Sequence, residues 1–185
     1  ALELELDWCA ITMAQPLPSS RMYETFIVEG IFKEDEIPFE DLKFFNSTLG
    51  NKHMSRNEIL NMWYEFNIGV NFVNNKNLRY GNLDRAIRDF KHVGYEIAPG
   101  HAMSVYCLGQ AYYKKGEFKL AQTCFDEAKA ITEKDEEWSK WFNYFQVDFL
   151  NPEGFFEKSQ LISERFGTSP EISNETYNKN RTMEG

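Results

Sequence analysis

The clearest pattern along the chain is a helical spacing of apolar residues across its middle, residues 56–131. Apolar side chains recur there every three or four positions, in four stretches separated by polar residues or by Gly and Pro. Ser55 and Glu58 form a capping-box pattern before the first stretch, so we expect a helix to begin near Arg56 and to end in the polar run 74–77. The other three helices are expected at 83–97, 102–114 and 119–131. Helices joined by such short turns predict stacked antiparallel hairpins.

The N-terminal stretch has a different period. Residues 1–15 alternate apolar with acidic or polar positions, at Leu2, Leu4, Leu6 and Trp8, which suits a strand with one buried face. Several of its residue types also favour helix, so both structures remain open, as does pairing within the chain or with a second copy. The proline-rich run 16–20 ends this element, and short helices are expected in the acidic, aromatic stretch that follows.

A short pattern occurs twice in the middle region. Gly, Ala and Phe in "GNLDRAIRDF" coincide with those in "GEFKLAQTCF" at one constant offset, and "IGVNF" precedes the first copy as "LGQAY" precedes the second. The residues that carry the repeat are Gly69, Ala86, Phe90, Gly109, Tyr112, Ala121, Phe125 and Ala128. Gly109 and Ala121 are small where two antiparallel helices must come close, while Tyr112 and Phe125 fill the space beside that contact.

At these positions the chain resembles the tetratricopeptide repeat (TPR) family, in which Leu-Gly-x-x-Tyr on one helix and Ala-x-x-x-Phe on the next recur about every 34 residues. The resemblance covers residues 56–166 and is most complete over 102–131. In the first copy Phe72 replaces the Tyr, Val93 replaces the last Ala, and extra residues lie between the helices around Asn74–Leu78. The resemblance implies an all-α stack of about three hairpins that binds other proteins.

The rest of the chain completes this organisation. Aromatic residues at helical spacing in 138–145, followed by residues 155–166, predict a third hairpin that caps the stack. Residues 167–185 contain few apolar side chains and are predicted to be a disordered tail. We therefore expect three parts: an acidic, aromatic N-terminal segment at 1–55, a repeat domain at 56–166, and the tail.

In a stack of hairpins, the first helix of each pair lines a concave groove. Side chains there that do not pack within a hairpin are candidates for partner binding. They are Phe66, Val70, Tyr106, Gln110, Tyr113 and Lys114. The alternative is that some of them pack beneath the N-terminal segment.

Charge and cysteine content exclude several classes of function. A formal net charge of −9 argues against binding a nucleic acid or an anionic membrane surface. No apolar run reaches the roughly 18 residues of a membrane span, so we expect a cytoplasmic protein. The three cysteines and three histidines have no metal-ligand spacing, and no glycine-rich phosphate loop occurs. A Cys-His nucleophile could assemble only in space, from Cys107 or Cys124 with His92 or His101. We therefore expect no catalytic residues, metal or cofactor.

These observations predict a non-catalytic protein–protein interaction module that binds a protein or peptide in its groove. A first alternative is an acidic immunity or antitoxin-type protein that neutralises a basic toxin. Its candidate residues lie in two acidic runs and are Glu34, Asp35, Glu36, Glu40, Asp41, Glu133, Asp135 and Glu136. A second alternative is a fragment of a receptor for peptide signals. The sequence names neither the partner nor the oligomeric state.

Overall fold

The computed structural model describes residues 6–33, 50–149 and 152–155, and the regular secondary structure in these ranges is helical throughout. The expected all-α fold is therefore confirmed. The elements are α1 (Arg21–Val28), α2 (Arg56–Ile68), the π-helical turn η3 (Gly69–Val73), α3 (Lys76–Tyr80), α4 (Leu83–Lys91), the π-helical turn η4 (His92–Ile97), α5 (Ala102–Lys115), α6 (Phe118–Lys134), α7 (Glu136–Tyr144) and the 3-10 turn η5 (Pro152–Gly154).

Local signals in the sequence set the helix boundaries. The predicted capping box is present, because the Ser55 hydroxyl accepts the N–H of Glu58 while the Glu58 carboxylate accepts the N–H of Ser55. The helix that begins there continues from α2 through η3 and ends at Asn74. The extra residues between the first two predicted helices form the short helix α3. Gly116, with a φ of +82°, makes the tight turn between α5 and α6.

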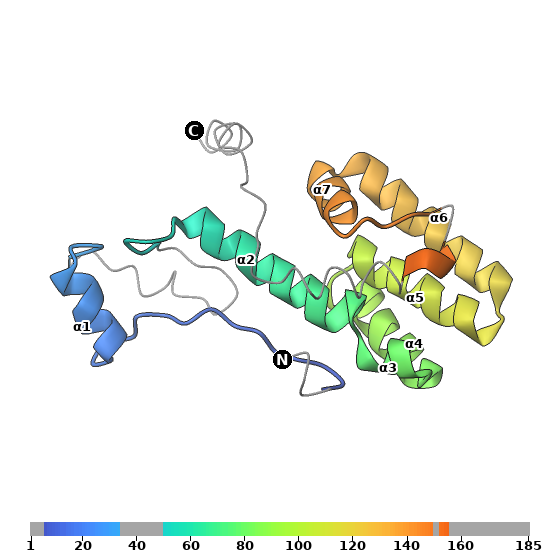
Figure 1. The fold of residues 1–185 in the computed structure, drawn as a ribbon, viewed down its shortest axis with the longest axis horizontal. Helices are drawn as coiled ribbons and strands as arrows, with labels where there is room; N and C mark the ends of the chain where they lie inside the picture. Colours follow the sequence, from blue (N-terminus) through green and yellow to red (C-terminus); the bar gives the residue numbers. More distant parts are fainter. Residues whose placement is uncertain (1–5, 34–49, 150–151, 156–185) are drawn as a thin grey trace.

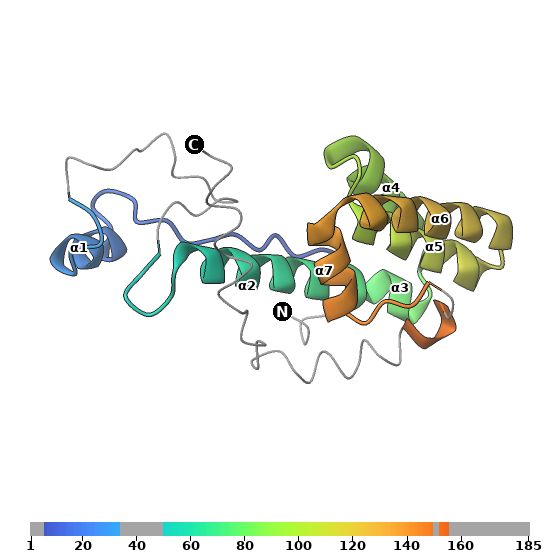
Figure 2. The same cartoon turned by 90° about the horizontal axis from the view of Figure 1, so that it is seen from above.

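α5 is the central helix of the fold. It packs against α6 and α4, and α7 contacts both α5 and α6 (Figures 1 and 2). From this group of helices α2 extends toward α1, which lies at the opposite end of the described structure (Figure 1). α1 has a small apolar cluster of its own, made by Tyr23, Phe26 and Phe32, whereas one large cluster extends from Ile68 to Phe155.

The residues that carry the repeat lie inside the helical group. All eight are buried: Gly69, Ala86, Phe90, Gly109, Tyr112, Ala121, Phe125 and Ala128. A Cβ placed on Gly109 would lie 2.6 Å from the Phe125 ring and 3.2 Å from the carbonyl oxygen of Ala121. The close approach of two helices predicted at Gly109 and Ala121 is therefore present.

The regions before and after the central helices differ in part from what the sequence indicated. The sequence left strand and helix open over 1–15, and residues 6–15 form neither; no second strand lies beside them in the described part of the chain. α7 provides the first helix expected for the third hairpin. Its expected partner at 155–166 and the expected tail at 167–185 lie outside the described residues, apart from Phe155.

Candidate polypeptide-binding surface

The predicted groove residues of α5 are covered by the chain itself. Tyr106 and Gln110 are 0% and 1% exposed, within a run from Ala102 to Tyr112 that is buried throughout. The expectation that these two side chains face an open groove is therefore wrong. The reason is that the described residues after α7, 145–149 and 152–155, lie over this side of α5.

The ring of Tyr106 is the centre of this contact. Edge-on rings of Phe142, Phe149 and Phe155 surround it, with centroids 5.7, 5.5 and 5.1 Å away. Such aromatic pairs add to the free energy gained by burial. The Tyr106 hydroxyl donates to the carbonyl oxygen of Asp148 at 3.5 Å, and burial raises the pKa of this tyrosine. The phenol is therefore neutral and serves as a donor.

Gln110 and Tyr113 hold the same covering segment. The Gln110 side-chain N–H donates to the hydroxyl oxygen of Tyr106 at 2.9 Å and to the carbonyl oxygen of Pro152 at 3.0 Å. The Tyr113 hydroxyl donates to the Glu153 carboxylate at 2.6 Å, and this hydrogen bond raises the pKa of Tyr113. α5 thus binds this segment, which includes η5, partly through the segment's main-chain carbonyls at Asp148 and Pro152.

Lys114 is directed toward a neighbouring helix. Its ammonium group donates to the carbonyl oxygen of Leu78, at 3.0 Å, in α3. Burial, and then the nearby Arg79, lower the pKa of Lys114. Its contact therefore links α5 to α3, although Lys114 is an exposed residue.

The helix formed by α2 and η3 holds a non-helical segment, residues 8–16. The side-chain amide of Asn71 pairs with both main-chain groups of Cys9: its Oδ1 accepts the Cys9 N–H at 2.8 Å, and its Nδ2 donates to the Cys9 carbonyl at 2.9 Å. The indole N–H of Trp63 donates to the carbonyl of Ile11 at 2.7 Å. The segment therefore runs antiparallel to α2, and Figures 1 and 2 show it beside that helix.

The side chains of this segment alternate between two environments. Cys9, Ile11 and Met13 are half-buried or buried, whereas Ala10, Thr12 and Ala14 are exposed. The period of two seen in the sequence is therefore present here. However, Leu6 and Trp8, which the sequence placed on the buried face, are 48% and 38% exposed. The packed face is the other one, because Asn71 and Trp63 fix the register of the main chain.

Phe66 in α2 and Val70 in η3, two of the groove candidates, remain partly accessible. Phe66 is 41% exposed and Val70 is half-buried. Phe66 borders a pocket of about 300 Å³ between α2, α1 and the N-terminal segment. Four methionines line the pocket: Met13, Met22, Met54 and Met62. Methionine is flexible and polarisable, so such a pocket adapts to apolar side chains of different shapes.

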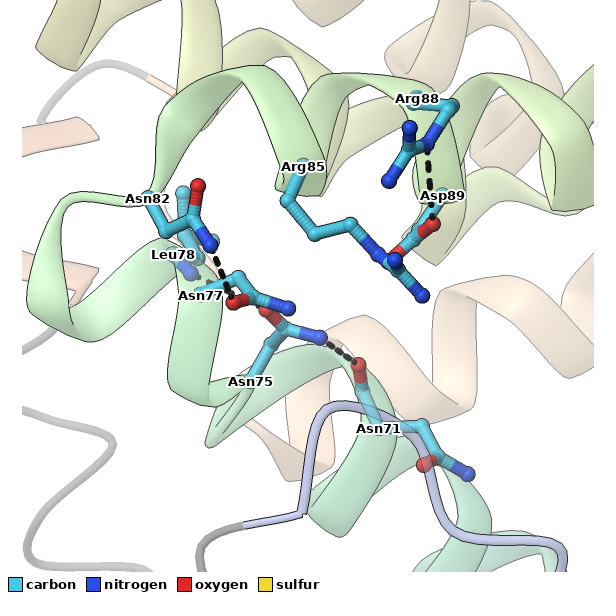
Figure 3. Close-up of polar contacts among 8 residues, drawn as sticks. All are labelled: Asn71, Asn75, Asn77, Leu78, Asn82, Arg85, Arg88 and Asp89. Atoms are coloured by element: carbon cyan, nitrogen blue, oxygen red, sulfur yellow. Dashed lines mark hydrogen bonds and ion pairs between the residues drawn. The ribbon is translucent and has the colours of Figure 1, made fainter.

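A cluster of asparagines positions Asn71 (Figure 3). The Asn75 side chain donates to the carbonyl of Asn71 at 3.0 Å and accepts the N–H of Leu78 at 3.0 Å. Asn82 donates to Asn77 at 3.1 Å, across the turn that leads into α4. These asparagine side chains bond main-chain groups that would otherwise lose their helical hydrogen-bond partners where the helix ends, after η3. The cluster thus fixes the helix end that presents Asn71 to Cys9.

Asn71 and Trp63 are not among the groove residues that the sequence predicted. The signal was the density of asparagines in "NIGVNFVNNKN", because Asn is a poor helix former whose burial requires a hydrogen-bond partner. Trp63 carried no distinguishing pattern, since one apolar face of a helix contains many such residues.

The candidate acidic residues fall in two places. Glu34, Asp35, Glu36, Glu40 and Asp41 lie outside the described residues. Glu133, Asp135 and Glu136 are exposed where α6 meets α7. The Asp135 carboxylate caps α7 by accepting hydrogen bonds from the main-chain N–H groups of Glu137 and Trp138. A carboxylate oxygen of Glu133 lies 3.9 Å from the ammonium nitrogen of Lys129. Two of these three carboxylates therefore have local partners.

The cysteines and histidines do not form a reactive arrangement in the described part of the chain. Burial raises the pKa of Cys107, and burial followed by the charge of Glu127 raises the pKa of Cys124 to about 11. Both thiols are thus protonated at neutral pH, which disfavours nucleophilic attack. The His101 ring packs between the rings of Phe72 and Trp138. Nδ1 of His92 lies 2.8 Å from a carboxylate oxygen of Glu96.

No group of three or more potential metal ligands among His, Cys, Asp and Glu occurs in the described residues. None of the helices described here combines the length and the apolar character that crossing a membrane requires.

Comparisons with known proteins give no relatives. No family model matches the chain, and searches of curated proteins and of solved structures find no significant match.

Proposed function

We propose that this chain is a non-catalytic protein–protein interaction module, with TPR-like hairpins that bind a protein or peptide partner along α2 and α5. The observation that carries the proposal is the pairing of the Asn71 amide with both main-chain groups of Cys9. A side-chain amide that contacts only the main chain can hold an extended polypeptide without regard to most of its sequence. On α5, Gln110 contacts the main chain at Pro152 in a related way.

The repeat pattern supports the same proposal. Gly109, Ala121 and Phe125 form the close helix contact expected in such a hairpin, and stacks of hairpins expose long faces that suit extended ligands. The partner would enter where the face is still accessible, at Phe66 beside the methionine-lined pocket and at the half-buried Tyr113. Exposed aromatic residues of this kind are common anchors in protein interfaces.

The test is selection of peptides from a random library displayed on phage, followed by affinity measurements on the purified peptides. We expect one family of peptides with a common apolar position, whose affinity falls about tenfold or more in Phe66→Ala or Tyr113→Ala. Leu120→Ala is the matched control, because Leu120 is an exposed apolar residue on the neighbouring helix α6. Peptides that bind all four proteins equally would contradict the proposal.

The toxin-neutralising alternative rests on the exposed carboxylates of Glu133, Asp135 and Glu136. It predicts that selected peptides are basic, that binding weakens steeply with salt, and that charge reversal at Glu133 and Glu136 abolishes it. Binding through Phe66 and Tyr113 should change little with salt.

A further inference from the structure

The helix formed by α2 and η3 already holds one polypeptide, the chain's own residues 8–12. The Asn71 amide accepts the N–H of Cys9 and donates to its carbonyl, and the Trp63 indole donates to the carbonyl of Ile11. All three of these hydrogen bonds go to the main chain of the segment. Every residue except proline offers the same N–H and C=O groups. This face therefore recognises an extended main chain, and another polypeptide in the same register would satisfy it equally well.

Residues 8–12 are held loosely. None of their five side chains is buried: Cys9 and Ile11 are half-buried and the other three are exposed. The ring of Trp8 packs edge-on against Phe72 at 5.2 Å, yet Trp8 remains 38% exposed. Burial begins only at Met13, which is 7% exposed. Because stretches with few buried side chains open at a small cost in free energy, residues 8–12 can leave the helix while Met13 stays in place.

The surroundings of Ile11 define what replaces it. Ile11 lines the pocket of about 300 Å³ together with Met62, Trp63 and Phe66. None of the described residues that line this pocket is charged, and residues 8–17 carry no charge either. A charged side chain placed there would lose its hydration without gaining a partner of opposite charge. The side chain that takes the place of Ile11 is therefore uncharged and apolar.

We infer that the partner is an extended, uncharged peptide that displaces residues 8–12, pairs one residue with the Asn71 amide and places an apolar side chain in the pocket two residues later. This assignment rests on the proposed function and adds to it the class of partner and its competitor. Residues 8–12 belong to the same chain, so they compete at a high effective concentration. They lower the apparent affinity for the partner in proportion to the fraction of molecules whose face is free.

The test uses a synthetic peptide with the sequence of residues 6–14, labelled with fluorescein and kept reduced, whose binding to the full chain is measured by fluorescence anisotropy. Ile11→Asp places a charge against the uncharged pocket and releases the chain's own segment. We expect this variant to bind the probe about tenfold or more tightly than the wild type does, because the face is free in more molecules. Ala10→Asp is the matched control, since Ala10 is exposed and lies outside the pocket lining. It should bind the probe as weakly as the wild type.

Changes at Asn71 and Cys9 test the main-chain contact. Asn71→Ala, added to Ile11→Asp, should weaken the binding of the probe about tenfold or more. Asn67→Ala in the same background should leave it unchanged, because Asn67 donates to the carbonyl of Trp63 within α2. A probe with Cys9→Pro lacks the N–H that Asn71 accepts and should also bind weakly. In the full chain, Cys9→Pro is a second way to release the segment, and it should raise the affinity for the unmodified probe as Ile11→Asp does.

Three results would overturn the inference. They are equal affinity of the probe for the wild type and Ile11→Asp, an equal gain in Ala10→Asp, and binding that Asn71→Ala leaves unchanged. Dimerisation of the wild type that Ile11→Asp abolishes would place residues 8–12 on a second copy, and so overturn the competition within one chain.

The proposed function can fail separately from this inference. Library-selected peptides that need Phe66 but bind the wild type and Ile11→Asp equally would overturn the displacement of residues 8–12 and leave the proposed function standing. Selected peptides that bind without regard to Phe66 and Tyr113 would contradict the proposed function itself.

Discussion

The ring of Phe125 occupies the space where Gly109 lacks a side chain. A Cβ on Gly109 would lie 2.6 Å from Cε1 and 2.7 Å from Cδ1 of that ring, far inside van der Waals contact. This pair sets how closely α5 and α6 approach in the most complete copy of the repeat. The absence of one side chain is therefore a structural requirement of the hairpin.

Gly109→Ala should lower the free energy of unfolding by about 1–2 kcal/mol, since overpacking costs more than the better helix propensity of Ala returns. Gly94→Ala is the matched control, because its Cβ would meet its nearest neighbours, Val105 and Ser104, at 3.4–3.5 Å. Urea unfolding followed by circular dichroism measures both variants. Equal urea midpoints for the two variants would contradict this expectation, because they would show that α6 moves away from the added methyl group at no cost in stability.

Protonation of His101 should destabilise the fold in acid. Burial lowers the pKa of His101 from 6.5 to about 4, and its Nδ1 accepts the N–H of Ser104 at the start of α5. Between these two pH values the unfolded chain binds a proton that the folded chain does not, so stability falls as pH falls. The loss should be on the order of 3 kcal/mol across this window.

Urea unfolding at a series of pH values measures this effect, with His101→Asn as the variant that keeps a capping side chain. Its stability should be lower at neutral pH, because contacts with Phe72 and Trp138 are lost, and should vary less between pH 6.5 and 4. His92→Asn should retain the full dependence of the wild type. If the free energy of unfolding of His101→Asn fell with pH as steeply as that of the wild type, groups other than His101 would cause the acid sensitivity.

Removing the amide of Asn71 should release the N-terminal segment while the helical group stays folded. Asn71→Ala deletes both hydrogen bonds to Cys9, so the Cys9 amide should exchange about tenfold or more faster. Asn67→Ala is the control, because Asn67 donates only to the carbonyl of Trp63 within α2. Unchanged exchange at Cys9 in Asn71→Ala would mean that apolar contacts alone hold the segment.

The contact between Gln110 and Pro152 should hold residues 145–149 and 152–155 on α5. Gln110→Met keeps a similar volume but leaves the half-buried carbonyl of Pro152 without this donor, which costs about 1–3 kcal/mol. Limited proteolysis should then cut near Pro152 faster than in the wild type. Gln122→Met changes an exposed glutamine on α6 in the same way and should have little effect. Equal cleavage rates in both variants would contradict this role for Gln110.

Local sequence signals were sufficient to predict most of the helix boundaries. The capping box at Ser55, the stop at Pro99 and Gly100 and the turn at Gly116 each act within a few residues, so their effect can be deduced without the fold. The small residue at Gly109 was also identified, because its place in a repeated pattern implied a close helix neighbour.

The candidate surface depended on contacts that are remote in sequence. Tyr106 and Gln110 were expected to be open, and they are buried by residues about 40 positions later in the chain. Asn71 and Cys9 are 62 positions apart, and nothing in either stretch indicates the other. The sequence by itself thus determined the all-α fold and the positions of its helices, because helix periodicity and capping depend on neighbouring residues. Only the tertiary structure decided which helix faces are covered, because covering a face requires a distant segment whose main-chain groups find partners there.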